Sequence, residues 1–328
     1  MESASESFHQ LNLKANLQSD RYIYLFACHE NDRELSEMEF RALFGQTPGV
    51  SAYIDSDVAI APERSPFISM RIDVLFTGAE LKDIVAQAGG IQLEGHTFKV
   101  LYIKHGLKRS YEEQRQLERQ VGARIRGIAE MRTPDLTFGL LSYEGGWLLG
   151  VCRMADPAWQ KHKRKPQNYS TGLSAALARS LVNIAVPDPA GIRAIDPCCG
   201  MGNVLVEALS MGIDIRGCDL NPLAVKGARE NLAYFGYDAS GLVTVGDMRE
   251  VSGHYHAAIL DMPYNLCSVL PQDVKRSMLA SLRKISDRAV VISTEEIEGD
   301  LLACGFRILD YGRAFKGSFV RKIWVCQG

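Results

Sequence analysis

The chain has 328 residues, of which 37 are basic and 39 acidic, so its formal net charge is −2. This length exceeds what one hydrophobic core usually organises, which predicts two domains. The balanced charge excludes the strongly basic composition of many nucleic-acid binders, so charge alone indicates no polyanionic partner.

The N-terminal half combines short strands and helices without regular alternation. Strands are expected at 22–27, 50–60, 67–76 and 98–103, helices at 34–44 and 81–88, and a hairpin at 138–151. A longer amphipathic helix is expected at 110–128, because Ser110 is a good N-cap and glutamates follow it in the first turn. This pattern predicts an α+β region over residues 1–155.

A polar stretch with two prolines, residues 156–172, separates the two halves and carries a basic run. Its candidate phosphate-binding residues are Lys161, Lys163, Arg164 and Lys165. Trp159 and Tyr169 flank the run with stacking surfaces, and Lys108 and Arg109 belong to a second small basic cluster. A solvated surface explains both clusters equally well, so these residues alone leave nucleic-acid binding open.

From residue 173 onward strands and helices alternate regularly, which predicts a parallel α/β sheet. An apolar strand ends at Asp196, and Gly200 and Gly202 follow before the next helix. Glycine is needed where the backbone takes a positive φ or approaches a ligand closely. Leu205 stands where a dinucleotide-binding turn has its third glycine, so that fingerprint fails. The candidate cofactor contacts of this turn are Asp196, Cys198, Gly200, Gly202 and Asn203.

Acidic residues also follow the next two expected strands. Asp219 comes after the strand at 213–217, where a carboxylate can accept both hydroxyls of a ribose. Asp247 follows the strand at 242–245 and can accept a hydrogen bond from an adenine amino group. Together with Asp196, which can pair with a cationic amine, they fit a nucleoside that carries an amino acid. The candidate contacts at these two strand ends are Asp219, Leu220, Asn221, Asp247 and Met248.

The fourth strand, 257–260, leads into the candidate catalytic loop Asp261, Met262, Pro263 and Tyr264. An aryl amine is a poor nucleophile because its lone pair is delocalised into the ring. The Asp261 carboxylate and the Met262 carbonyl can bind its hydrogens and favour tetrahedral nitrogen, while Tyr264 stacks on the base. A strand-end turn with a buried tyrosine is the alternative interpretation.

These motifs resemble those of S-adenosylmethionine (SAM) dependent amino methyltransferases. Residues 167–262 are similar to the tRNA guanosine-10 2-amino methyltransferase family. The similarity includes the helix at 173–185, the glycine turn, and the segments 217–221 and 227–232. The family usually has proline where this chain has Met262. If the backbone carbonyl at 262 is what matters, Met262→Pro is expected to hold or raise the rate, because proline stiffens the loop.

The resemblance implies a Rossmann-like class I SAM-dependent methyltransferase domain, α/β with a mostly parallel seven-stranded sheet, over residues 173–328. It implies that 1–155 is a ferredoxin-like plus THUMP-like RNA-binding region, joined by the basic linker 156–172. The implied activity is methyl transfer from SAM to the 2-amino group of guanine in tRNA. The implied partner is RNA, with a small activating subunit as a further candidate.

Three alternatives stay open at this point. The substrate is ribosomal RNA guanine or DNA adenine instead, or the chain is a catalytically silent RNA-binding or scaffold protein that retains SAM. An N-terminal recognition region favours RNA over DNA, and Met262 is the residue that favours the silent protein.

The eight cysteines include no C-x-x-C pair, so no metal site is expected. No apolar run reaches the about 18 residues that a membrane helix needs, and no export signal is recognisable. Free thiols without an export signal predict a cytoplasmic protein that does not enter membranes.

Overall fold

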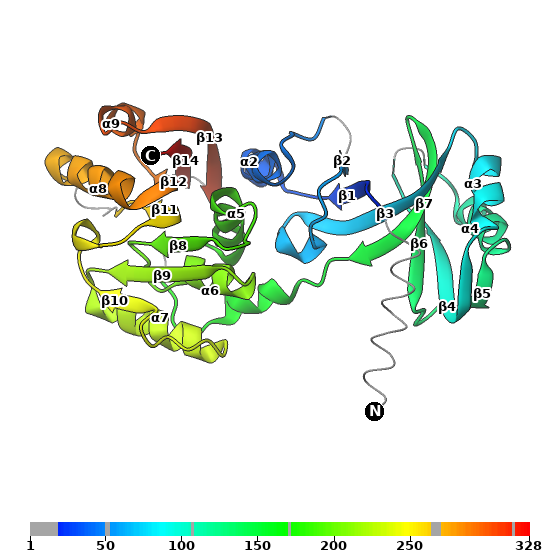
Figure 1. Ribbon diagram of the computed structural model, residues 1–328, viewed down its shortest axis with the longest axis horizontal. Coiled ribbons are helices and arrows are strands. Elements are labelled where there is room, and N and C mark those ends of the chain that lie inside the picture. Colours follow the sequence, from blue (N-terminus) through cyan, green and yellow to red (C-terminus); the bar gives the residue numbers. More distant parts are fainter. Residues whose placement is uncertain (1–18, 50–52, 106–107, 170–171, 264–269, 317–318) are drawn as a thin grey trace. The chain divides into compact units, whose positions relative to one another are not determined.

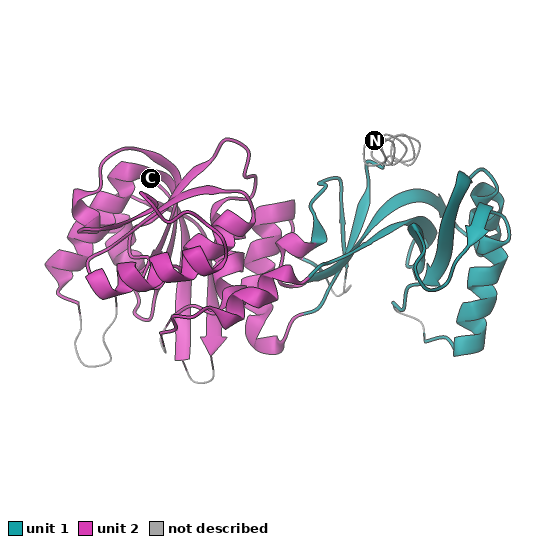
Figure 2. Ribbon diagram, turned by 90° about the horizontal axis from the view of Figure 1, so that it is seen from below, with its two compact units in different colours: residues 1–27, 48–62, 68–156 teal, residues 28–47, 63–67, 157–328 magenta. Residues whose placement is uncertain are grey.

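The computed structural model describes residues 19–49, 53–105, 108–169, 172–263, 270–316 and 319–328. The chain forms two compact units, each described here by itself (Figure 2). Unit 1 takes residues from 1–27, 48–62 and 68–156, and unit 2 takes residues from 28–47, 63–67 and 157–328. The polypeptide therefore passes between the units several times.

This division differs from the single boundary that the sequence predicted at 156–172. The chain does change unit after Asp156, but the linker itself belongs to unit 2, and so do residues 28–47 and 63–67. Helix α2 (Arg33–Phe44) is amphipathic, and its partners lie far along the chain, so local sequence signals do not reveal them. A fragment that begins at residue 173 would lack part of unit 2.

Unit 1 is built on a seven-stranded sheet with the strand order β2-β1-β3-β7-β6-β4-β5 (Figure 1). Its strands are β1 (Tyr22–Phe26), β2 (Tyr53–Ser56), β3 (Ile68–Gly78), β4 (Gln92–Tyr102), β5 (Arg126–Ala129), β6 (Leu136–Tyr143) and β7 (Gly146–Met154). Helices α3 (Leu81–Ala88) and α4 (Tyr111–Gly122) bury Ile84 and Val121 in the core against this sheet. The unit is α+β, and its THUMP-like and ferredoxin-like character stays a prediction.

The helix expected at 110–128 is shorter in the structure. It begins as predicted, because Ser110 Oγ accepts from Glu113 N at 3.2 Å and Glu113 Oε2 accepts from Ser110 N at 2.7 Å. It ends at Gly122, and residues 126–129 form β5, which pairs in parallel with β4. The helical spacing of apolar residues continues past Gly122, but residues 126–129 pair with β4 instead of extending the helix.

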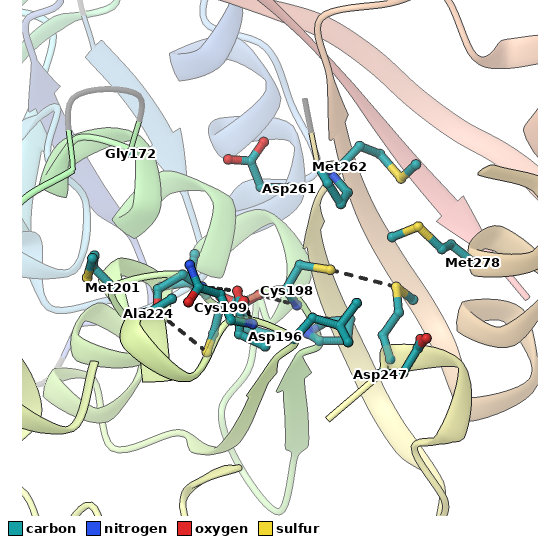
Figure 3. A pocket seen from close by; sticks show the side chains of 18 of the residues that line it. Gly172, Asp196, Cys198, Cys199, Met201, Ala224, Asp247, Asp261, Met262 and Met278 are labelled. Carbon is teal, nitrogen blue, oxygen red and sulfur yellow. Dashed lines mark hydrogen bonds between the residues drawn. The ribbon is translucent and has the colours of Figure 1, made fainter. Parts of the chain in front are cut away.

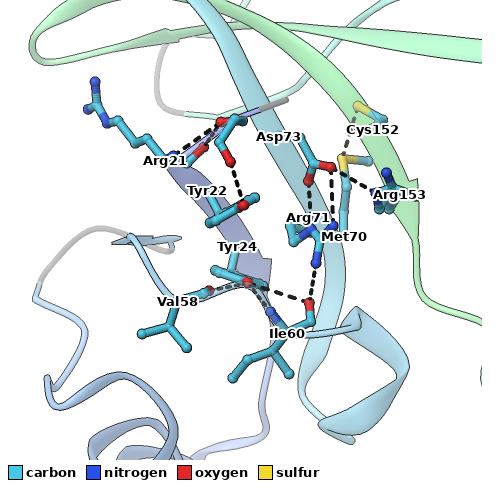
Figure 4. A network of polar contacts seen from close by, with 11 residues as sticks. Arg21, Tyr22, Tyr24, Val58, Ile60, Met70, Arg71, Asp73, Cys152 and Arg153 are labelled. Atoms are coloured by element: carbon cyan, nitrogen blue, oxygen red, sulfur yellow. Dashed lines mark hydrogen bonds and ion pairs between the residues drawn. The ribbon is translucent and has the colours of Figure 1, made fainter. Parts of the chain in front are cut away.

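A buried carboxylate organises the middle of unit 1 (Figure 4). Asp73 is 5% exposed and pairs with Arg71 at 2.6 Å and with Arg153 at 2.8 Å. Arg71 also donates to the carbonyl of Ile60 at 2.8 Å, and Ile60 N donates to the Tyr24 hydroxyl at 2.7 Å. Because these buried polar groups have partners, the network joins β1, β3 and β7 without an unpaired charge.

Unit 2 contains a second seven-stranded sheet, with the order β10-β9-β8-β11-β12-β14-β13. Strand β14 is antiparallel to both of its neighbours, and the other pairs are parallel. The strands are β8 (Arg193–Asp196), β9 (Asp214–Asp219), β10 (Val243–Val245), β11 (Tyr255–Asp261), β12 (Ser286–Ser293), β13 (Arg307–Lys316) and β14 (Phe319–Gln327). This order confirms the predicted Rossmann-like class I methyltransferase fold.

Helices pack on both sides of this sheet. They are α2 (Arg33–Phe44), α5 (Ala175–Ala185), α6 (Asn203–Ser210), α7 (Pro222–Tyr234), α8 (Gln272–Ile285) and α9 (Glu298–Ala303). Leu279 and Leu282 of α8 pack with Leu260 and Val291 of the central strands in one core. No helix among the described residues is both long and apolar enough to cross a membrane.

A buried polar network explains why N-terminal segments belong to unit 2. Glu39 of α2 is fully buried and accepts hydrogen bonds from Asn183 Nδ2 at 2.5 Å and Ser65 Oγ at 3.0 Å. Arg64 Nε donates to Asn183 Oδ1 at 3.0 Å, and Arg179 Nε donates to the carbonyl of Arg64 at 2.9 Å. Burial raises the pKa of Glu39 to about 7. These bonds fix α2 and residues 63–67 against α5.

Candidate active site

A cavity of about 490 Å³ lies at the carboxyl ends of β8, β9, β10 and β11 in unit 2 (Figure 3). Open α/β sheets bind their ligands at this edge. The predicted site residues in its lining are Asp196, Cys198, Gly200, Asn203, Asp219, Leu220, Asn221, Asp247, Met248, Asp261, Met262 and Pro263. Gly202 shapes the turn as the N-cap of α6, and Tyr264 lies outside the described residues.

The turn after β8 needs glycine at two positions. Gly200 has φ +51° and Gly202 has φ +77°, both in the left-handed region. A Cβ on Gly202 would lie 3.1 Å from the Cβ of Ala228, so this glycine also permits the close approach of α7. The turn is closed by bonds from Cys199 N to Cys218 O at 3.0 Å and from Gly202 N to Cys199 O at 2.8 Å.

Asp219, at the end of β9, holds the glycine turn in place. Its Oδ2 accepts from Gly200 N at 2.9 Å, and its Oδ1 accepts from Asn221 N at 2.9 Å. Asn221 Oδ1 in turn accepts from Leu223 N at 3.0 Å and caps α7. A carboxylate has about four lone-pair sites, so Asp219 retains capacity for hydroxyl donors.

Asp196 and Asp261 end the paired strands β8 and β11. Burial raises the pKa of Asp196 well above its ordinary range, and the charges of Asp261 and Asp219 raise it further, against a hydrogen bond from Cys198 N. Burial also raises the pKa of Asp261 to about 7, while the positive charge of Arg321 lowers it. Carboxyls in such surroundings favour a cationic or hydrogen-bond-donating ligand.

Two buried oxygens of the lining have no hydrogen-bond partner among the described residues. They are Oδ1 of Asp261 and Oδ1 of Asn203. Asn203 Nδ2, by contrast, donates to the carbonyl of Leu173 at 2.8 Å. A buried acceptor left unpaired disfavours the folded state by about 1–3 kcal/mol. Both oxygens therefore retain the capacity to accept a hydrogen bond.

Asp247, after β10, is engaged by its neighbour Arg249. Arg249 Nε lies 3.0 Å from both carboxylate oxygens, and Arg249 N donates to Oδ1 at 2.8 Å. The hydrogen bonds from Arg249 lower the pKa of Asp247, which stays a carboxylate. Its predicted hydrogen bond to an adenine amino group stays a prediction, and that contact would share the carboxylate with Arg249.

Met262 ends the ladder between β11 and β12 and packs in the core. Its side chain is 3% exposed and lies in one cluster with Met278 and Leu279. Its backbone N donates to the carbonyl of Ile292 at 2.8 Å. Proline has no N–H, so it would remove this bond. The structure thus argues against the expectation that Met262→Pro holds or raises the rate.

Sulfur atoms form an apolar wall of the cavity. Cys198 Sγ lies 3.8 Å from Met248 Sδ, and Met278 lines the same wall. Burial raises the pKa of Cys198 well above its ordinary range. A thiol held neutral in this way is not a nucleophile. No group of three His, Cys, Asp or Glu side chains suited to a metal ion occurs in the described part of the chain.

The linker forms part of the cavity, which the sequence did not predict. Tyr169 and Gly172 line it. The fully buried Asn231 donates to the carbonyls of Gln167 and Met201, both at 2.9 Å, and accepts from Gln167 N at 2.8 Å. The segment 227–232 stood out in the sequence, but this role of its asparagine did not.

The predicted phosphate contacts of the linker lie on and beside the 3₁₀ turn η3 (Ala158–Arg164). Those with exposed side chains are Lys161, Lys163 and Arg164. Lys163 Nζ lies 5.1 Å from the centroid of the Trp159 ring, within cation–π range. Lys165 is half-buried, and burial lowers its pKa.

The other predicted pair belongs to unit 1. Lys108 is exposed. The Arg109 guanidinium lies 5.3 Å from the Trp147 ring centroid, and its Nε lies 3.2 Å from the Tyr102 hydroxyl. Arg109 is therefore held against an aromatic surface, and its contact with RNA stays a prediction.

The strand order, the glycine turn and the acidic strand ends together define a class I methyltransferase domain, whose cofactor is SAM. Residues 162–268 match the UPF0020 family, described as an RMKL-like methyltransferase domain. The match lies within unit 2 and includes the glycine turn, the strand-end acids and the candidate catalytic loop.

Curated relatives agree with this assignment. A tRNA (guanine(10)-N2)-dimethyltransferase of Methanothermobacter thermautotrophicus is 36% identical over 107 residues, 32% of this chain and 31% of that protein. One from Pyrococcus abyssi is 27% identical over 61% of this chain and 63% of its own length. A mouse U6 snRNA (guanine-N(2))-methyltransferase, THUMPD2, is 28% identical over 54% of this chain and 34% of that protein.

The predicted resemblance to the guanosine 2-amino methyltransferases is confirmed by these matches. The chain spans less than two thirds of the length of each of these relatives. Among solved structures, TrmN from Thermus thermophilus superposes with a TM-score of 0.46 at 16% identity, over 94% of this chain and 99% of that one.

Proposed function

We propose that this chain transfers a methyl group from SAM to the 2-amino group of a guanine in tRNA. The proposal rests mainly on the buried Oδ1 of Asp261, which lies in the cavity lining and has no hydrogen-bond partner in the described part of the chain. The surrounding domain is similar to guanine-N2 methyltransferases. The named relatives act on different RNAs but on the same atom. This shared target supports guanine N2 more directly than it supports a particular RNA.

The residues of the cavity fit SAM. When bound, SAM supplies a methyl group on a positively charged sulfur. Asp219 would accept the ribose hydroxyls while it holds Gly200, and Asp196 would pair with the cationic amino group. Oδ1 of Asn203, which has no hydrogen-bond partner among the described residues, would offer the amino group of SAM a second acceptor.

The catalytic loop would act on the target amine. Asp261 accepts one N–H of the guanine amine through Oδ1, and the Met262 carbonyl accepts the other. Both bonds strengthen as the nitrogen becomes tetrahedral, so they stabilise the transition state more than the ground state. Transfer would form the N–CH₃ bond as the S–CH₃ bond of the sulfonium breaks and leaves a neutral thioether, and the Asp261 carboxylate would receive the proton that the amine loses.

RNA would be held by unit 1 and by the basic turn η3. The side chains of Lys161, Lys163 and Arg164 are exposed, and the Lys163 ammonium lies over the Trp159 ring. The same linker lines the cavity through Tyr169, which is exposed and offers a ring for stacking. The linker therefore combines phosphate contacts with one wall of the candidate site.

The test is methylation by the purified full chain of unfractionated tRNA and rRNA, with SAM that carries a labelled methyl group. Mass spectrometry of the nucleosides should find the label in N2-methylguanosine from tRNA. Label in rRNA guanine or in another RNA would keep the target atom and replace the substrate. Label in adenine would contradict the proposed atom, and no label in any pool, despite bound SAM, would favour the silent protein.

A further inference from the structure

We propose that Arg321 is a positioning residue of the methyl-transfer site, whose guanidinium keeps the Asp261 carboxylate charged and able to accept hydrogen bonds from the target amine. This inference rests on the proposed function. Arg321 does not line the cavity, so its role would be exerted through Asp261.

The register of the sheet places Arg321 and Asp261 on one face. Asp261 pairs with Ile292 of β12, and Ile292 pairs with Ile323 of β14. Register partners share a face, and side chains two residues apart on a strand share a face as well. Arg321, two residues before Ile323, therefore faces the same side as Asp261. The opposite face carries Trp324 and the core against α8.

The same register places Arg321 at the carboxyl edge of the parallel strands. Ser293, the last residue of β12, pairs with Lys322, so Arg321 lies one step beyond the end of that strand. Strands β11 and β14 are separated by β12 alone, which makes their backbones about 10 Å apart. An arginine side chain is long enough to bring its charge close to Asp261 across this gap.

Arg321 is built into the protein and is not a mobile surface cation. It is 3% exposed, pairs in the sheet with the buried Ala314, and its guanidinium lies 4.8 Å from the centroid of the Phe319 ring. A buried charge acts through a low dielectric and is screened little by salt. Its effect on Asp261 should therefore persist at physiological ionic strength.

The groups around Asp261 give Arg321 a clear electrostatic task. Asp196 and Asp219 stand at neighbouring strand ends, and the charge of Asp261 raises the pKa of both Asp196 and the Cys198 thiol. Burial favours the protonated form of Asp261, and the charge of Arg321 opposes it. A protonated Asp261 would lose acceptor capacity just where the amine needs it.

The experiment titrates Asp261 directly, without requiring activity. The full chain is labelled with ¹³C at aspartate carboxyls, and the Asp261 resonance is assigned as the one that disappears in Asp261→Asn. Removing the charge with Arg321→Gln should raise the titration midpoint of Asp261 by about one pH unit. Arg321→Lys, which keeps the charge, should leave the midpoint within a few tenths of a unit.

The matched control is Lys322→Gln on the same strand. Lys322 faces the other side of the sheet and pairs with Glu296 at 2.9 Å. Its loss removes one positive charge from the same strand and should leave the Asp261 midpoint unchanged. An equal shift in Lys322→Gln would show a general charge effect and overturn the proposal.

Activity supplies the second measurement. In single-turnover methylation of tRNA, Arg321→Gln should shift the acid limb of the pH–rate profile to higher pH by about one unit, as for the Asp261 midpoint. It should also lower the rate at pH 7 several-fold. Arg321→Lys should retain most of the wild-type rate at this pH. An unchanged Asp261 midpoint in Arg321→Gln overturns the proposal. If Arg321→Gln does not fold, the proposal is overturned when Arg321→Lys, which keeps the charge, shifts the Asp261 midpoint by about a full pH unit. Absence of RNA methylation in the wild type would reject the proposed function, while the carboxyl titration would still decide the role of Arg321.

Discussion

The side chain of Asn231 binds both backbone groups of Gln167, accepting from its N–H at 2.8 Å and donating to its carbonyl at 2.9 Å. Its Nδ2 also donates to the Met201 carbonyl at 2.9 Å, inside the glycine turn. One buried amide thus ties the linker to the loop that is proposed to hold the cofactor.

Asn231→Asp should weaken SAM binding at least fivefold, because a carboxylate cannot donate to two carbonyls and leaves both buried acceptors unpaired. Isothermal titration calorimetry measures the affinity. Asn168→Ala is the control, since Asn168 is exposed, makes one side-chain bond to Lys165 O and does not line the cavity. Equal affinities of Asn231→Asp and the wild type would show that the hydrogen bonds of Asn231 do not shape the cofactor site.

Asp219→Ala should reduce the affinity for SAM at least tenfold. The change removes the proposed ribose acceptor and also releases Gly200 N and Asn221 N, which the carboxylate holds in the structure. Asp219→Asn keeps one acceptor oxygen and should give an intermediate affinity. Calorimetry, with circular dichroism to verify the fold, tests the order of the three proteins, and an unchanged affinity of Asp219→Ala would reject the ribose assignment.

Asp261→Ala should lower the rate of methyl transfer a hundredfold or more, equivalent to about 3 kcal/mol of transition-state stabilisation. The affinity for SAM should stay within a few-fold, because the carboxylate is proposed to bind the target amine. Single-turnover rates and calorimetry separate the two effects. A variant that methylates at the normal rate would contradict the proposed role of the loop.

Met262→Pro should destabilise the protein by about 2–4 kcal/mol and should not raise the rate. The substitution removes the bond from Met262 N to Ile292 O and empties space beside Met278. Urea unfolding measures the loss, and Met262→Leu, which keeps the N–H and the apolar volume, should be nearly neutral. A Met262→Pro protein that is as stable as the wild type would mean that the loop tolerates proline after all.

The pH dependence of stability should include a contribution from Glu39. Burial raises its pKa from the ordinary value of 4.5 to about 7 in the folded state, so the folded protein binds more protons than the unfolded chain between these values. Stability therefore falls as pH rises through this window, by up to about 3 kcal/mol.

Glu39→Gln removes this titration, so its stability relative to the wild type should be higher at pH 8 than at pH 5. Urea unfolding at both pH values gives the comparison, and the difference between the two pH values cancels any constant effect of the substitution on packing. If the relative stability were the same at pH 5 and pH 8, Glu39 would be shown to titrate normally despite its burial.

Much of unit 2 followed from the sequence because its signals are local. Apolar runs marked the strands, and the acids at strand ends had to meet at one edge, since parallel strands end on the same side. Asp196, Asp219 and Asp261 lie in one cavity lining.

The remaining features depend on contacts between distant residues. Nothing near Asn231 indicates that its amide reaches Gln167, and nothing near Met262 shows that its N–H completes a ladder with Ile292. The burial of Arg321, which is 3% exposed, depends on how the final strands pack. The sequence predicted helix α2, but it did not predict that this helix belongs to unit 2.

That membership matters while the chain is being synthesised. Arg41 of α2 pairs with Asp310 of β13, which is 269 positions later. At about 5–20 residues per second, the helix leaves the ribosome roughly 15–50 seconds before this strand is made. During that interval the apolar side of α2, with Leu35, Met38 and Phe40, has no finished sheet to cover it. Completion of unit 2 must therefore await the last strands translated.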